Sequence, residues 1–288
     1  MANLRIGSDD HKRLFCGEFT GTFRNYDVRA LKWPQLDEAS LARLRAMPFW
    51  AEAVSTERTA GARVRLMADA EPDRLVREAI AMQSYEETRH AALLTGLIEH
   101  CGIELPEIHA DKPRDAEWGF MRMGYGEVFD SFFAFGLFKV AEETGFFPPE
   151  LIRIFEPFIE EEARHILFFV NWAAYRRRNL GAGPRAWFQL RRASAIGLQA
   201  MGRMQTAVQL SRGGGAGDDF VMDAHGAIDQ SITMRKLAET CLVENERRLA
   251  PYDERLLRPT IVPRLVRLAL NSMPHGDPRK KVASRDSR

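Results

Sequence analysis

EETRH at residues 86–90 and EEARH at residues 161–165 are two copies of one pattern that differ only at the middle position. In each copy a glutamate precedes a histidine by three residues, as Glu87 precedes His90 and Glu162 precedes His165. On an α-helix, residues three apart lie on the same face. The interpretation of the repeat therefore depends on whether these pairs lie on an apolar or a solvated face of their helices.

The sequence around both copies predicts a helical protein. Few strand signals are present, and long stretches with apolar residues at helical spacing are separated by Pro and Gly. Gly102 is a predicted helix stop. The four main predicted helices cover about 48–70, 72–101, 116–144 and 149–178. Short turns join the first to the second and the third to the fourth, so two antiparallel hairpins are expected, with one copy of the pattern on the second helix of each.

Each of these helices carries a carboxylate near the middle of its apolar stripe. A buried carboxylate without a partner is costly, and a divalent cation removes that cost. Four carboxylates and two imidazoles in one layer could hold two such cations, which is the arrangement of di-iron and di-manganese sites in helix bundles. The predicted metal ligands are Glu57, Glu87, His90, Glu127, Glu162 and His165. The alternative interpretation is a set of solvated charges on amphipathic helices.

One ligand position has two candidates. Residues equally far from the turn of an antiparallel hairpin lie at one level, and Glu57 and Glu87 satisfy this condition. Glu127 is farther from its turn than Glu162 is. Asp130 fits the register better but lies at the edge of the stripe. Glu127 is therefore the predicted ligand, and Asp130 is kept as the alternative ligand.

The six residues resemble the ligand set of the ferritin-like di-iron carboxylate superfamily. The resemblance covers about residues 50–180, and the separations between Glu57 and Glu87 and between Glu127 and Glu162 are similar to those of its oxygen-activating members. It implies an all-α fold: a ferritin-like four-helix bundle of two antiparallel hairpins with a crossover, plus additional C-terminal helices. Leu94 stands where a radical-storing small subunit carries Tyr, so a stable tyrosyl radical is not expected.

The resemblance also implies roles around the metals. Glu86 and Glu161 are expected to bond the metal-ligating histidine of the opposite helix, and Arg89 and Arg164 to pair with these outer carboxylates. A plain surface salt bridge is the alternative for all four. Ser131 lies one turn after Glu127, where oxygenases of the superfamily often carry Thr, and is a candidate catalytic residue or simply a small packing residue.

The expected domain organisation has four parts. Residues 1–45 form an N-terminal extension that looks irregular, with a short helix near 37–46, and residues 46–180 form the di-metal bundle. Residues 181–274 form a C-terminal helical extension packed on the bundle, with a flexible loop at 212–219. Residues 275–288 form a disordered basic tail.

Composition narrows the classes of function. The net charge of +1 gives no support to nucleic-acid binding. The three cysteines lie far apart and form no CxxC motif. Their spacing suits a reducing cytoplasm and excludes a rubredoxin module. No signal peptide is evident, and the most apolar stretch, 132–140, is too short to span a bilayer. A cytoplasmic protein is expected.

The predicted function is that of an oxidoreductase. Two iron ions (Fe/Fe or Mn/Fe) with O2 as co-substrate are expected to hydroxylate, desaturate or N-oxygenate a small apolar or aromatic molecule. Some aromatic residues of 132–138 would line its pocket. An external reductase or ferredoxin would supply electrons, and a homodimer is one expected assembly. The alternatives are a ferroxidase, iron-handling or peroxide-scavenging protein and, with less support, an RNA-modifying di-iron hydroxylase.

Overall fold

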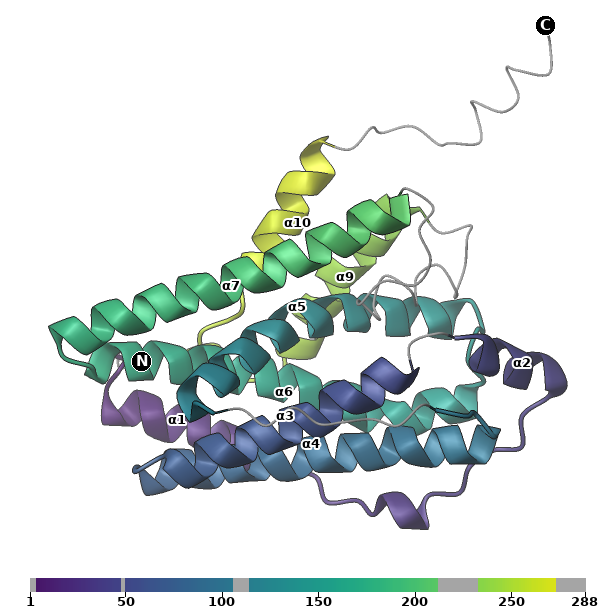
Figure 1. Cartoon of the computed structure of the whole chain (residues 1–288), viewed down its shortest axis with the longest axis horizontal. Coiled ribbons are helices and arrows are strands. Elements are labelled where there is room, and N and C mark those ends of the chain that lie inside the picture. The colour runs from purple at the N-terminus through teal and green to yellow at the C-terminus, as the bar shows by residue number, and fades with distance from the viewer. Residues whose placement is uncertain (1–3, 48–49, 106–113, 212–232, 273–288) are drawn as a thin grey trace, which may run out of the picture.

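The computed structural model describes residues 4–47, 50–105, 114–211 and 233–272, and only the backbone of 204–211 (Figure 1). These parts of the chain form α-helices and one 3-10 turn, without a strand. The prediction of an all-α protein is confirmed. The helices are α1 (Asp9–Gly21), η1 (Val28–Ala30), α2 (Glu38–Ala46), α3 (Trp50–Ala70), α4 (Arg74–Cys101), α5 (Ala116–Glu143), α6 (Pro149–Asn179), α7 (Ala182–Ser211), α9 (Met234–Leu249) and α10 (Ile261–Ser272).

Local signals explain where the central helices begin and end. The side chain of Asp73 accepts hydrogen bonds from the backbone of Leu75 and Val76 and so caps α4, and Asp115 caps α5 in the same way. Gly102 ends α4 in the left-handed conformation, with φ of 60°, which glycine adopts at little cost. The four main helices thus lie where the sequence predicts them.

Helices α3, α4, α6 and α5 pack around a common core. α3 contacts α4 and α5, and α6 contacts α5 and α4. Ser84 donates a hydrogen bond to the carbonyl of Gly61 across the α3–α4 pair at 3.0 Å, and Ser131 donates to Glu162 across the α5–α6 pair at 3.1 Å. Both contacts lie about midway along their helices, as expected for antiparallel pairs joined by short turns.

The expectation of an irregular N-terminal segment is wrong for Asp9–Gly21, which forms α1. Ser8 caps this helix by accepting from the backbone N–H of His11. Phe15 and Phe19 are buried, and α1 packs against α4 and α6. The spacing of four residues between His11, Phe15 and Phe19 places them on one face, but the charges around them obscure this pattern. The short helix expected near 37–46 is present as α2.

The C-terminal helices cover one side of the central four (Figure 1). α7 and α9 each pack against α5 and α6, and α10 contacts α5 and α9. The predicted loop at 212–219 and the predicted tail at 275–288 lie outside the described residues. Within the part of the chain that the structure describes, no helix combines the length and the apolar character needed to cross a bilayer.

Candidate metal centre

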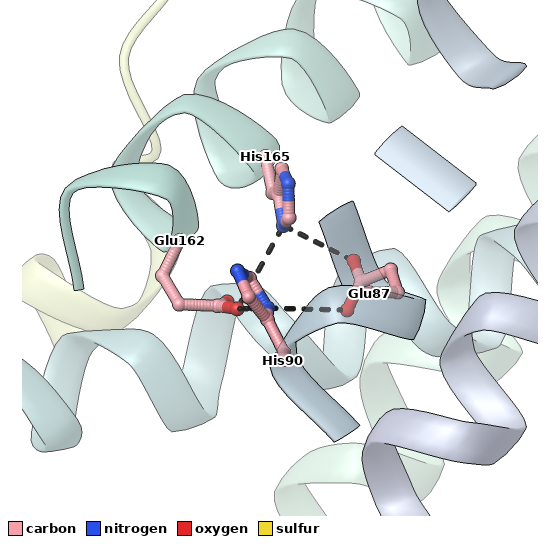
Figure 2. A group of neighbouring side chains, drawn as sticks. All are labelled: Glu87, His90, Glu162 and His165. Atoms are coloured by element: carbon pink, nitrogen blue, oxygen red, sulfur yellow. Dashed lines mark ion pairs between the residues drawn. The ribbon is translucent and has the colours of Figure 1, made fainter. Parts of the chain in front are cut away.

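Two of the central helices bring the repeated pattern together in the core (Figure 2). Glu87 and His90 on α4 face Glu162 and His165 on α6, and all four side chains are buried. One ligand atom from each lies within 4.8 Å of the others. This buried group could hold a metal ion.

The inner nitrogen of each imidazole points into this group. Nδ1 of His165 lies 3.1 Å from Oε1 of Glu87, and Nδ1 of His90 lies 3.2 Å from Oε1 of Glu162. Neither Nδ1 atom has a hydrogen-bond partner, although both are buried. Buried polar atoms without partners are rare because they lose their hydration, so each one calls for an explanation. Coordination of a cation between them would satisfy both nitrogens.

The structure also places the other two predicted ligands at this centre. Oε2 of Glu57 lies 3.5 Å from Nδ1 of His90 and has no hydrogen-bond partner. Glu127 receives a hydrogen bond of 3.4 Å from Gln83, and its other oxygen is buried without a partner. Glu57 and Glu127 therefore lie beside the buried group of four, Glu57 near His90 and Glu127 near Gln83. Asp130, the alternative, instead pairs with Arg203 on α7, whose Nε lies 3.0 Å from it.

Burial and charge together set the protonation of the centre. Burial raises the pKa of Glu57 to about 8 and holds the pKa of Glu127 well above its usual range. Burial has the same tendency at Glu87, but His165 and His90 outweigh it and lower that pKa to about 2. The carboxylates raise the pKa of both histidines well above its usual range, against the effect of burial. Protons thus compensate the negative charge of the carboxylates. A divalent cation could take the place of these protons.

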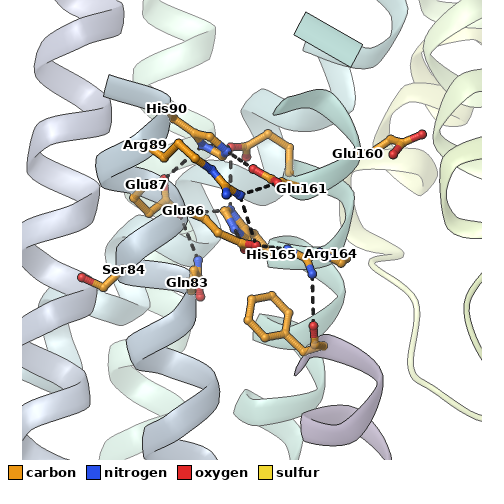
Figure 3. A network of polar contacts seen from close by, with 12 residues as sticks. Gln83, Ser84, Glu86, Glu87, Arg89, His90, Glu160, Glu161, Arg164 and His165 are labelled. Atoms are coloured by element: carbon orange, nitrogen blue, oxygen red, sulfur yellow. Dashed lines mark hydrogen bonds and ion pairs between the residues drawn. The ribbon is translucent and has the colours of Figure 1, made fainter. Parts of the chain in front are cut away.

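Glutamates from the opposite helix hold the outer nitrogens of the histidines (Figure 3). Nε2 of His165 lies 2.9 Å from Oε2 of Glu86, and Nε2 of His90 lies 2.8 Å from Oε2 of Glu161. These are the crossed contacts that the resemblance implies. If Nε2 donates its proton outward, the lone pair of a neutral imidazole is left on Nδ1, facing the centre.

Two buried arginines hold the outer glutamates in turn. Arg89 donates to Glu161 at 2.6 Å and to the carbonyl of Arg24 at 3.1 Å. Arg164 is paired with Glu86 and donates to the carbonyl of Phe19 at 3.1 Å. Both arginine side chains are only 4% exposed, so these pairs are not surface salt bridges. The N-terminal segment thus contributes backbone carbonyls to the support of the centre.

Sequence patterns did not point to two residues that contact this network. Gln83 is fully buried and donates to Glu87 at 3.2 Å, and its position one turn before Glu87 is a signal that could have identified it. Tyr26 donates to Glu161 at 3.4 Å, and the guanidinium of Arg89 lies 3.9 Å from the centre of its ring. Tyr26 lies outside the four central helices, and no local pattern marks it.

An apolar cavity of about 160 Å³ lies beside the centre. Glu57 and Phe158 line it, and the ring of Phe158 packs 4.2 Å from that of His90, measured between centroids. Ala134 and Phe138, from the aromatic run 132–138, also line it. Most of the remaining lining is aliphatic or aromatic. The carboxylate of Glu57 thus both lines the cavity and lies near His90.

Comparisons of this chain with protein-family models, with curated proteins and with solved structures found no match.

Proposed function

We propose that this chain is a ferritin-like di-iron oxidoreductase that uses O2 to oxidise a small apolar molecule. In this proposal, α3–α6 form a ferritin-like four-helix bundle, and α7, α9 and α10 are additions to that bundle. One observation carries it: the buried Nδ1 atoms of His90 and His165 lack a hydrogen-bond partner and face each other's carboxylates, while the opposite helix binds their Nε2 atoms. This is the arrangement expected of ligands positioned for metal.

The donor set fits iron. Glu57, Glu87, His90, Glu127, Glu162 and His165 would hold two ions, because mixed carboxylate and imidazole ligands suit iron and also allow manganese. A metal pair held by these residues would, in its reduced state, supply electrons to O2. An external reductase or ferredoxin would restore the reduced state.

The chain itself contributes orientation and a dry environment. The crossed bonds of Glu86 and Glu161 fix the planes of the two imidazoles. Ser131 donates to Oε2 of Glu162 at 3.1 Å and so orients that carboxylate. Phe158 separates His90 from the apolar cavity, which would hold the carbon skeleton of a substrate next to Glu57. The cavity favours an organic substrate over iron storage or peroxide removal.

The experiment is a metal analysis of the wild type and of the variants Glu87→Ala and Glu162→Ala. We expect about two iron ions per chain in the wild type after anaerobic loading with ferrous ion, and a loss of both in the variants. Exposure to O2 should then oxidise the iron and change the absorption spectrum of the wild type alone. Glu160→Ala is the matched control, because Glu160 lies next to Glu161 but pairs with Arg24 at the surface.

Two results would contradict the proposal. One is a wild type that binds less than about one metal ion per chain. The other is equal metal content in the wild type and in both ligand variants.

A further inference from the structure

A second cavity has a volume of about 310 Å³ and shares no lining residue with the apolar one. Residues of α5, α6, α7 and the segment 257–261 line it. Three arginines from three different parts of the chain line this cavity: Arg177 on α6, Arg192 on α7, and Arg258 before α10. No acidic side chain lines it. The convergence of three positive charges without a carboxylate requires an explanation, since like charges repel.

The arginines next to Arg177 and Arg192 in the sequence are paired with acidic side chains, unlike the cavity arginines. Arg176, next to Arg177, donates to Glu117 at 2.9 Å, and Arg191, next to Arg192, pairs with Asp115 at 2.7 Å. Among the described residues, no carboxylate lies within ion-pair distance of the three cavity arginines. The fold therefore pairs one arginine of each neighbouring couple with acids near the start of α5 and directs the other to the cavity.

The polar contacts of the cavity arginines are with neutral groups. Nε of Arg192 donates to the hydroxyl of Tyr125 at 2.6 Å, and Nη2 of Arg258 donates to the carbonyl of Tyr252 at 2.8 Å. Nη1 of Arg258 is buried without a hydrogen-bond partner. Burial lowers the pKa of Arg258, although Asp253 and Glu18 act in the opposite direction. Burial of a charge that is only partly compensated is costly, and a bound anion would reduce that cost.

We propose that this cavity binds a small organic anion through a carboxylate or phosphate group. Guanidinium groups recognise both oxyanions by charge-assisted hydrogen bonds. The hydroxyl of Thr260 offers a further polar contact, and Val128, Val170 and Ile261 give the carbon skeleton an apolar wall. The site is separate from the proposed metal centre and does not depend on its chemistry.

The test is isothermal titration of the purified full-length chain with inorganic phosphate and, separately, with succinate, at constant ionic strength set by chloride. We expect saturable binding of at least one probe. The variants Arg177→Gln and Arg258→Gln should each weaken it at least about tenfold, because each removes a charge-assisted hydrogen bond. Arg177 makes no side-chain hydrogen bond or ion pair with a described residue, so we expect Arg177→Gln to fold like the wild type. Arg176→Gln is the matched control and should bind like the wild type.

The comparison of probes identifies the group that is recognised, since the tighter probe shows whether the site selects phosphate or carboxylate. The proposal is overturned if neither probe binds the wild type, or if Arg177→Gln and Arg258→Gln bind as tightly as the wild type does. The second outcome would mean that the probes bind outside this cavity.

Discussion

Glu86 on α4 and His165 on α6 form a fully buried hydrogen bond of 2.9 Å between two helices. Glu161 on α6 and His90 on α4 repeat this bond in the opposite direction at 2.8 Å. The first glutamate of each repeated segment thus contacts the histidine of the other segment. The two segments are thus linked to each other by both bonds.

These crossed bonds predict how metal affinity responds to a change outside the ligand set. The replacement Glu86→Gln keeps the shape of the side chain but removes the charge that orients His165 and compensates Arg164. We expect metal affinity to fall by about 10–100-fold, measured by titration with ferrous ion under anaerobic conditions. Glu160→Gln, at the surface, should leave the affinity unchanged. Equal affinities in the two variants would show that Glu86 does not support the metal site.

The two candidates for the α5 ligand give opposite predictions. Glu127→Ala should reduce the metal content of the protein, because its carboxylate faces the centre beside Gln83. Asp130→Ala should retain the metal and lose at most about 1 kcal/mol of unfolding free energy, since its pair with Arg203 is partly exposed. Metal analysis and chemical denaturation measure the two effects. Loss of metal from Asp130→Ala, with retention by Glu127→Ala, would reverse the assignment.

The apolar cavity can be filled by a substitution outside the predicted ligand set. Ala134→Phe introduces a ring into a space of about 160 Å³. We expect the variant to retain its metal but to lose binding of a small apolar probe such as benzene, which enters dry apolar cavities. Equilibrium dialysis measures the binding. Gly197→Ala on α7 is a control, because an added methyl group there meets no neighbouring atom within 4 Å. Unchanged benzene binding in Ala134→Phe would place the probe elsewhere.

Acid should destabilise the protein through His11. This side chain is fully buried, with Nδ1 accepting from the backbone of Gly7 and Nε2 bonded to Asn171, and burial lowers its pKa below 6.5. The unfolded chain therefore takes up a proton as the pH falls through about 6.5, before the folded protein does. The contribution of neutral His11 to the free energy of unfolding is complete above that pH. Below it, this contribution falls by up to about 1.4 kcal/mol per pH unit.

Urea denaturation of the wild type and of His11→Gln between about pH 7.5 and 5 measures this effect, since the unfolded pKa of histidine lies in that range. The two proteins are compared by the slope of unfolding free energy against pH. The difference between their slopes isolates the effect of His11 from that of the other titrating groups. His100→Gln, at an exposed histidine, should keep the slope of the wild type. An identical pH dependence in His11→Gln would show that another group is responsible.

Sequence patterns predicted the central helices because their signals are local. Apolar residues at helical spacing, the capping residue Asp73 and the terminal Gly102 act within one or two turns of the chain. Placement of Glu87 and Glu162 within apolar stripes predicted their burial for the same reason. The spacing between each glutamate and its histidine predicted that the two share a face, which is a property of any α-helix.

Contacts between distant residues could not be inferred in this way. The prediction failed for α1, since charged side chains surround its apolar positions and its stability depends on packing against α4 and α6. The carbonyls of Phe19 and Arg24 reach the arginines of the repeated segments only after that packing has formed. Tyr26 contacts Glu161 for the same reason.

The sequence by itself thus determined the four central helices, the faces on which their carboxylates and histidines lie, and the candidate ligand set. Only the tertiary structure decided that Asp130 pairs with Arg203 on α7, and that an apolar cavity lies beside Glu57. It alone also decided that three arginines surround a second cavity. The physical reason is that helix formation and side-chain spacing depend on neighbouring residues, whereas burial, ion pairing and cavities depend on which helix surfaces come into contact.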